Sequence, residues 1–167
     1  MSKTRGGVRH AARTRGHLAS HAAAPMYGVG TFHDQPHARD YDPWEHAAML
    51  GVPIVFRDDL PDPGMVACYS EEHAAIFVRP TLHRAVERCA IAHEIVHYEH
   101  GDVGTSILQE RRADRIAARR LIRPRRLLAL EALTEDPAVV AFELHVTERI
   151  MRAHIDMVHE GLLRRTA

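Results

Sequence analysis

The stretch that decides the fold is "CAIAHEIVHYEHGD", residues 89–102, in which histidine and glutamate side chains interrupt an apolar helical pattern. His93 and His97 are four residues apart, so a helix points both the same way, with roughly 5–6 Å between their Cβ atoms. Two imidazole nitrogens can then bind one ion at about 2.0–2.1 Å, a zinc distance. Glu94 follows His93 directly and is too displaced on the helix to bind the metal itself, but it can reach a water on the metal. This arrangement is the H-E-x-x-H pattern. We therefore expect a Zn²⁺ site with His93 and His97 as ligands.

A catalytic zinc site needs a third protein ligand and an open fourth position. His100 is rotated away from the predicted pair, so the ligand should come from another element. In "ILQERRADRIAARRLI" (107–122) two carboxylates stand one turn apart on the stripe that the alanines share. We expect Glu110 to be the third ligand and Asp114 to support it by accepting the outer N–H of a ligand histidine. The alternative, with Asp114 as the ligand, stays open. The arginines fall mostly off this stripe and predict a solvated basic face: Arg111, Arg112, Arg115, Arg119 and Arg120.

Composition limits the class of protein. The 167 residues are 46% hydrophobic with a formal net charge of zero, which removes any global argument for nucleic-acid or membrane-surface binding. No segment approaches the roughly 20 apolar residues of a membrane span, and we expect a cytoplasmic protein. The two cysteines, Cys68 and Cys89, cannot form a disulfide scaffold. Cys89 precedes His93 by one turn, but three consecutive turns cannot all reach one tetrahedral ion, so a buried free thiol is expected there.

The order of predicted elements indicates an α+β fold with three parts. Residues 1–40 are basic and predict a flexible tail, residues 41–126 the metal-binding core, and residues 127–167 a helical, helix-turn-helix-like subdomain. A short helix with Asp42 as N-cap opens the core. Three strand candidates follow, and they suit a small antiparallel sheet, the last two as a hairpin: 52–57, 65–70 and 74–79. The remaining segments predict helices at 81–101 (capped by Thr81), 107–122 and 124–133, one opening at Pro137 after Asp136, and one after Thr147.

The stretches "AHEIVHYEHGD" and "ERRADRIAARRLIRP" resemble the ImmA/IrrE family of metallo-endopeptidases, and the upstream "DPWEHAAMLGVPIVFRDDLPDPGMVACYS" resembles that family's usual lead-in. The resemblance covers residues 42–124 well. It implies a zincin-like core and a protein substrate, because enzymes of the family cut helix-turn-helix repressors in phage or mobile-element immunity switches or in stress responses. Two positions depart from the family's common pattern: Val96 replaces a glycine, and Arg112 replaces a glutamate. The second departure removes a competing ligand and favours Glu110.

The expected mechanism is zinc-assisted peptide hydrolysis, in which Glu94 takes a proton from water and gives it to the leaving amine. Tyr98, Tyr69 and His100 are open candidates for stabilising the oxyanion. The substrate is expected to lie extended along an edge strand, either "AAIFVR" or "MVACYS".

Two other classes of function compete with this expectation. The segment 139–158 has helix-turn-helix character, so a DNA-binding module is possible, although acidic residues dilute the charge of its second helix. A partner-binding zinc protein without hydrolytic activity is the third class. Glu94 argues against it, because a structural zinc site has no need of a base.

Overall fold

The computed structural model describes residues 40–104 and 106–163, and these lie within one compact unit of the chain. The predicted tail of residues 1–40 falls, apart from Asp40, outside the described residues. The α+β class is confirmed. The elements are α1 (Pro43–Leu50), β1 (Ile54–Phe56), β2 (Ala67–Ser70), β3 (Ala75–Val78), α2 (Arg84–His100), α3 (Ile107–Leu121), α4 (Pro124–Glu131), α5 (Pro137–Glu143) and α6 (Glu148–His159).

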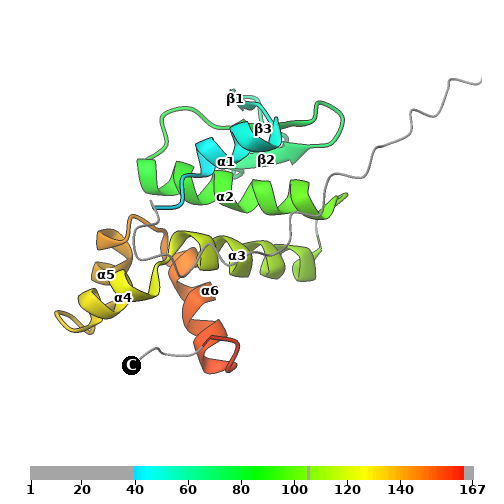
Figure 1. Ribbon diagram of the computed structural model, residues 1–167. Coiled ribbons are helices and arrows are strands. Elements are labelled where there is room, and N and C mark those ends of the chain that lie inside the picture. The colour runs from blue at the N-terminus through cyan, green and yellow to red at the C-terminus, as the bar shows by residue number, and fades with distance from the viewer. Residues whose placement is uncertain (1–39, 105, 164–167) are drawn as a thin grey trace, which may run out of the picture. The chain divides into compact units, whose positions relative to one another are not determined.

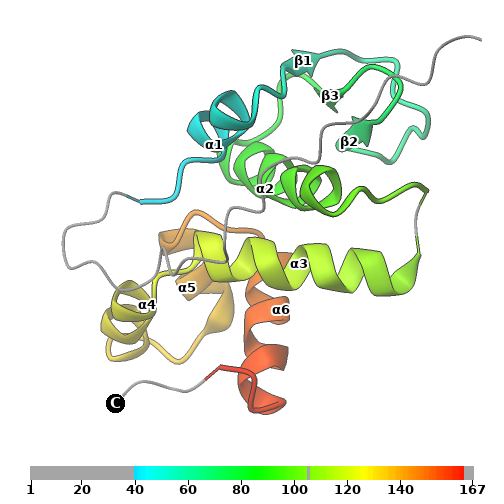
Figure 2. The same ribbon diagram turned by 45° about the vertical axis from the view of Figure 1, so that its right-hand side comes forward.

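Helix α2 is the central element, with the sheet and α1 on one side and α3 on the other (Figures 1 and 2). Its apolar residues therefore divide between two cores. Ile91 and Ile95 are fully buried against the strands and α1, whereas Cys89 and Ala92 belong to a core shared with α3 and the C-terminal helices. Residues of both the predicted core (41–126) and the predicted C-terminal subdomain contribute to this second core. The boundary at residue 126 stays a prediction.

The sheet has the strand order β1-β3-β2 and is mixed. The predicted hairpin is confirmed, because β2 pairs with β3 in antiparallel fashion. The prediction of a wholly antiparallel sheet is wrong, since β1 pairs with β3 in parallel. The connection of residues 57–66 carries the chain past the centre to the far edge, and the hairpin then returns β3 between the other two strands. β3 is the central strand, and three of its four residues, Ala75, Ile76 and Val78, are buried there. It is therefore not an edge strand that could receive a peptide, and β2 is.

Local capping signals explain where the helices begin and end. Asp42 is the N-cap of α1, as predicted, and its carboxylate accepts the backbone N–H groups of Trp44 and Glu45. The predicted cap at Thr81 is wrong. Thr81 adopts a positive φ of 62°, and α2 begins later with His83 as its N-cap. Asp136 and Thr147 cap α5 and α6 as expected. Within the described residues, no helix has both the length and the apolar character needed to cross a membrane.

Candidate metal centre

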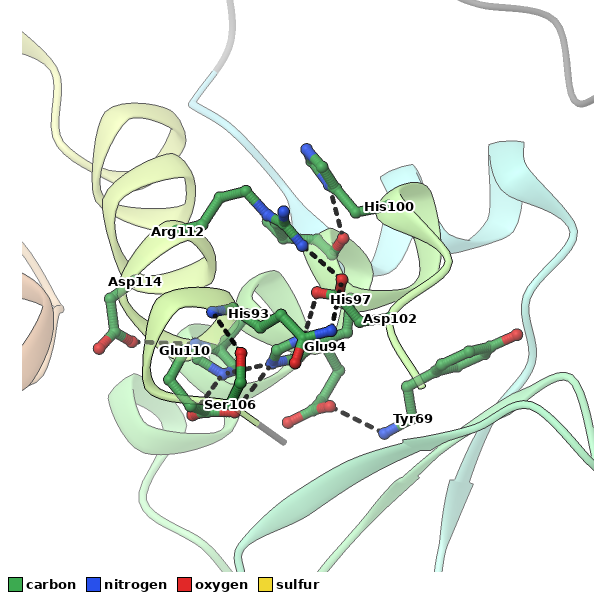
Figure 3. Close-up of polar contacts among 12 residues, drawn as sticks. Tyr69, His93, Glu94, His97, His100, Asp102, Ser106, Glu110, Arg112 and Asp114 are labelled. Atoms are coloured by element: carbon green, nitrogen blue, oxygen red, sulfur yellow. Dashed lines mark hydrogen bonds and ion pairs between the residues drawn. The ribbon is translucent and has the colours of Figure 1, made fainter. Parts of the chain in front are cut away.

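Helices α2 and α3 lie side by side and bring the three predicted ligands together. The alanines of α3 that face α2 and the neighbouring core are fully buried (Ala113, Ala117 and Ala118), so the two backbones can approach closely. His93 and His97 are each only 7% exposed, and their Nε2 atoms are 2.9 Å apart. The carboxylate of Glu110 lies 3.3 Å from each Nε2 atom, one oxygen toward each ring (Figure 3).

These separations fit a tetrahedral metal site. In a tetrahedron with bonds of about 2.1 Å, two ligand atoms are roughly 3.4 Å apart. The nearest donor separations of 2.9, 3.3 and 3.3 Å are close to that value, and all three donor groups lie within 4.8 Å of one another. Two imidazoles and one carboxylate are also a donor set that zinc prefers. The residues present therefore fit Zn²⁺, which His93, His97 and Glu110 would hold.

The outer nitrogen of each histidine meets a carboxylate. Asp114 Oδ1 is 2.9 Å from His93 Nδ1, and Asp102 Oδ2 is 2.9 Å from His97 Nδ1. Such partners fix the orientation of a ligand ring and raise its basicity. Asp114 lies on the outer side of the His93 ring, whereas Glu110 faces the inner nitrogens. This geometry favours Glu110 over Asp114 as the ligand, although the metal-binding roles themselves stay predictions.

Asp102 is a residue that the sequence reasoning missed. The end of α2 folds it back, because Gly101 adopts the left-handed conformation (φ 60°) and Asp102 N–H donates to His97 O. Together with the bond from Gly101 N–H to Tyr98 O, this is a Schellman motif. The signal that could have found Asp102 is the glycine that follows the helical pattern, with an aspartate directly after it. The motif places Asp102 over the last turn of the helix and so beside His97.

Asp102 is in turn held from α3. Its other oxygen accepts hydrogen bonds from Gln109 Nε2 at 3.1 Å and from the guanidinium of Arg112. Although burial raises the pKa of Asp102, these bonds and the one with His97 outweigh it and leave the pKa at about 2. At this position the resemblance predicts a glutamate in many members of the family. In this chain the position carries the positively charged Arg112, which binds Asp102 and so helps to orient His97.

Glu94 points toward the sheet rather than toward α3. Its Oε2 accepts the backbone N–H of Tyr69, in β2, at 2.8 Å (Figure 3). Burial raises the pKa of Glu94, while the neighbouring imidazoles of His93 and His97 oppose that rise. A glutamate with a raised pKa is a stronger base than an ordinary carboxylate, and a pKa closer to the working pH still lets it return the proton.

Arg149, from α6, bridges the two carboxylates of α3. Its Nη2 donates to Glu110 at 2.9 Å and its Nε to Asp114 at 2.8 Å. The pKa of Glu110 falls to about 2, chiefly through its hydrogen bond with His93 and further through Arg149. This contact spans 39 residues of sequence to Glu110, and no local pattern could have predicted it.

The excess of carboxylates also changes the pKa of His93. Burial lowers the pKa of His93, but hydrogen bonds with Asp114 and Glu110 outweigh burial and raise it to about 9. In the metal-free chain this position therefore attracts a cation even at neutral pH. A dication would compensate the same carboxylates more completely than a proton does.

Other candidates lie away from the three donors. The hydroxyl of Tyr69 points away from the imidazoles, and His100 Nδ1 is 2.9 Å from Val96 O (Figure 3). Cys89 is a buried free thiol, as expected, and its sulfur accepts the N–H of Thr147. The prediction of a merely solvated basic face on α3 is wrong for three of its arginines, which form ion pairs: Arg112 with Asp102, Arg115 with Glu160, and Arg120 with Glu99.

Comparison with models of protein families matches residues 47–154 to peptidase M78, described as the IrrE N-terminal-like domain. The match covers more than half of the chain and contains every residue of the centre described above. No curated protein and no solved structure matches the chain.

Proposed function

Because the chain belongs to the M78 peptidase family, with its IrrE N-terminal-like domain, we propose that it is a zinc-dependent endopeptidase. The observation that carries the proposal is the convergence of His93, His97 and Glu110 within 4.8 Å, beside the half-buried Glu94. A site built only for structure would close a fourth position with protein and would not need that glutamate.

Zinc at these three residues would activate a water and polarise the scissile carbonyl. The remaining work belongs to side chains of the chain itself. Asp102 and Asp114 hold the imidazole rings in orientation. Glu94 accepts the proton of the attacking water and delivers it to the leaving amine. The bond from Tyr69 N–H fixes one carboxylate oxygen of Glu94, so the other is the oxygen that exchanges the proton.

The substrate backbone is proposed to lie along β2. This strand is at the edge of the sheet, and no other strand of the described residues pairs with its outer side. Since Tyr69 N–H reaches Glu94, the outer edge of β2 runs directly beside the catalytic carboxylate. An extended peptide that adds to this edge would bring its carbonyl groups past the metal centre.

The substrate class is proposed from the family resemblance: a small helix-turn-helix repressor, in an immunity switch of a phage or mobile element or in a stress response. The test combines the purified chain with a repressor encoded by a neighbouring gene, zinc, and a chelator in a parallel reaction. A discrete pair of fragments should appear with zinc and disappear with chelator. Glu94→Gln should bind zinc like the wild type and yield no fragments. Cleavage by Glu94→Gln at the wild-type rate would exclude Glu94 as the base.

Direct DNA binding through α5 and α6 has less support. A recognition helix needs free basic side chains, and α6 offers only Arg149 and Arg152. Arg149 is already bound by Glu110 and Asp114. A mobility shift at low salt would revive this function, since phosphate contacts are strongest there.

A further inference from the structure

A groove with a basic wall lies outside the metal centre, between α3 and the end of α6. It encloses about 550 Å³. Its exposed apolar lining consists of Leu108, Leu162 and the half-buried Ile116, of which Leu108 is 74% exposed, and Met157 lies fully buried beneath them. Exposed leucines beside a concave surface are typical of sites that bind another apolar surface.

The basic wall consists of arginines spaced by single helical turns. Arg111, Arg115 and Arg119 line the groove at intervals of four residues, which is a rise of about 6 Å each along α3. Arg115 binds both carboxylate oxygens of Glu160 at 2.6 Å. Arg111 and Arg119 are exposed, and among the described residues neither has a hydrogen bond or ion pair with another side chain. The net charge of the whole chain is zero, so this excess is local.

We propose that this groove binds an acidic amphipathic helix of a partner protein. Carboxylates two turns apart on such a helix have the same spacing as Arg111 and Arg119, which have no side-chain partner among the described residues, and Glu160 already shows how a carboxylate meets the arginine between them. Leucine-like side chains beside them would cover the apolar lining. The chain's own outer segments, 1–39 and 164–167, are rich in arginine and contain a single acidic residue, Asp34, so their charge does not suit the groove.

The apolar lining distinguishes this partner from a nucleic acid, whose phosphates would leave Leu108, Ile116 and Leu162 uncovered. The groove also adjoins the metal centre, because Arg112 lines it and binds Asp102, the partner of His97. A docked helix would therefore hold a protein beside the proposed active site. That last use rests on the proposed peptidase function, whereas the binding itself does not.

The test measures binding without catalysis, by fluorescence anisotropy on the full chain carrying Glu94→Gln. The probe is a labelled 20-residue alanine-based helix with glutamates at i and i+8 and leucines on the adjoining stripe. The comparison probes are the same peptide with lysine for glutamate and a 20-base-pair DNA duplex. We expect saturable binding of the acidic peptide and at least tenfold weaker binding of both comparison probes.

The variant Arg111→Glu with Arg119→Glu should weaken binding of the acidic peptide at least tenfold. The matched control reverses two exposed arginines outside the groove, Arg84 and Arg125, and should bind within twofold of the parent. If the double glutamate variant melts early, Arg111→Gln with Arg119→Gln replaces it, with at least threefold weakening expected. The proposal fails if the acidic peptide does not saturate, if groove and control variants bind alike, or if DNA binds more tightly. Repressor cleavage is measured separately, so failure here leaves the proposed function untouched.

Discussion

Asp102 offers the sharpest test of how the candidate metal centre is organised, because it supports the predicted ligand His97 without being a predicted ligand itself. Its carboxylate is 2.9 Å from His97 Nδ1 and is held by Gln109 and Arg112. Asp102→Asn keeps the shape but removes the charge that orients His97. Loss of such a partner costs roughly 10- to 100-fold in metal affinity. That range corresponds to about 1.4–2.7 kcal/mol of binding free energy.

The same change should also destabilise the metal-free protein. Hydrogen bonds to charged groups contribute roughly 1.5–3 kcal/mol each, and the ion pair with Arg112 is discounted because that side chain is 40% exposed. We expect a loss of about 1–3 kcal/mol in total, seen in urea denaturation of chelator-treated protein.

Zinc affinity is measured by competition with a chromophoric chelator at constant pH. The matched control is Asp58→Asn, an exposed aspartate in the loop after β1, which should change neither quantity. The reasoning is refuted if Asp102→Asn binds zinc within twofold of the wild type. A loss of affinity shared equally by Asp58→Asn would point to a general charge effect and refute it as well.

Three further predictions use the same assays. Glu110→Ala should lose most bound zinc while the fold persists, and Asp114→Ala should lose roughly 10- to 100-fold in zinc affinity. If zinc titrations show the larger loss for Asp114→Ala, Asp114 is the ligand instead. Arg149→Met should weaken zinc binding severalfold through a mobile Glu110, with Arg149→Lys intermediate, and unchanged affinity would contradict that coupling. His154 is buried, and burial lowers its pKa, so the unfolded chain binds more protons and stability falls as pH drops below about 6.5. His154→Leu should therefore show a smaller stability loss between pH 8 and pH 5 in urea denaturation, whereas the exposed control His159→Leu should follow the wild type.

How far the sequence could predict this structure depends on the range of each interaction. His93 and His97 could be placed together because a helix fixes residues four apart on one face. Glu110 and Asp114 could be placed on the facing helix because their alanine neighbours need a close contact. Asp102 lies at intermediate range, and the left-handed turn at Gly101 determines its position. The sequence could predict that turn, but the contact between Asp102 and His97 is visible only in the structure.

The pairing of the strands was beyond such reasoning. Three short apolar runs specify that a sheet forms, but not which strand takes the centre. The parallel pairing of β1 with β3 depends on the path of residues 57–66. The side chain of Arg79 holds that path, since it donates to the backbone oxygens of Asp58, Asp62, Pro63 and Met65. An arginine at the end of a strand gives no sign of this role in a sequence.

The contact of Arg149 with Glu110 and Asp114 indicates a structural role for the C-terminal helices rather than DNA binding. An independent DNA-binding subdomain would keep its basic side chains free, yet this guanidinium binds the proposed third ligand and its neighbour. The same helix buries Ile150, Met151 and Met157 in the core that contains Ala117 and Leu121 of α3. Removing residues 127–167 would therefore both expose that core and release Glu110. The C-terminal helices are better understood as the support that holds α3, and with it the proposed carboxylate ligand Glu110, against the two histidines.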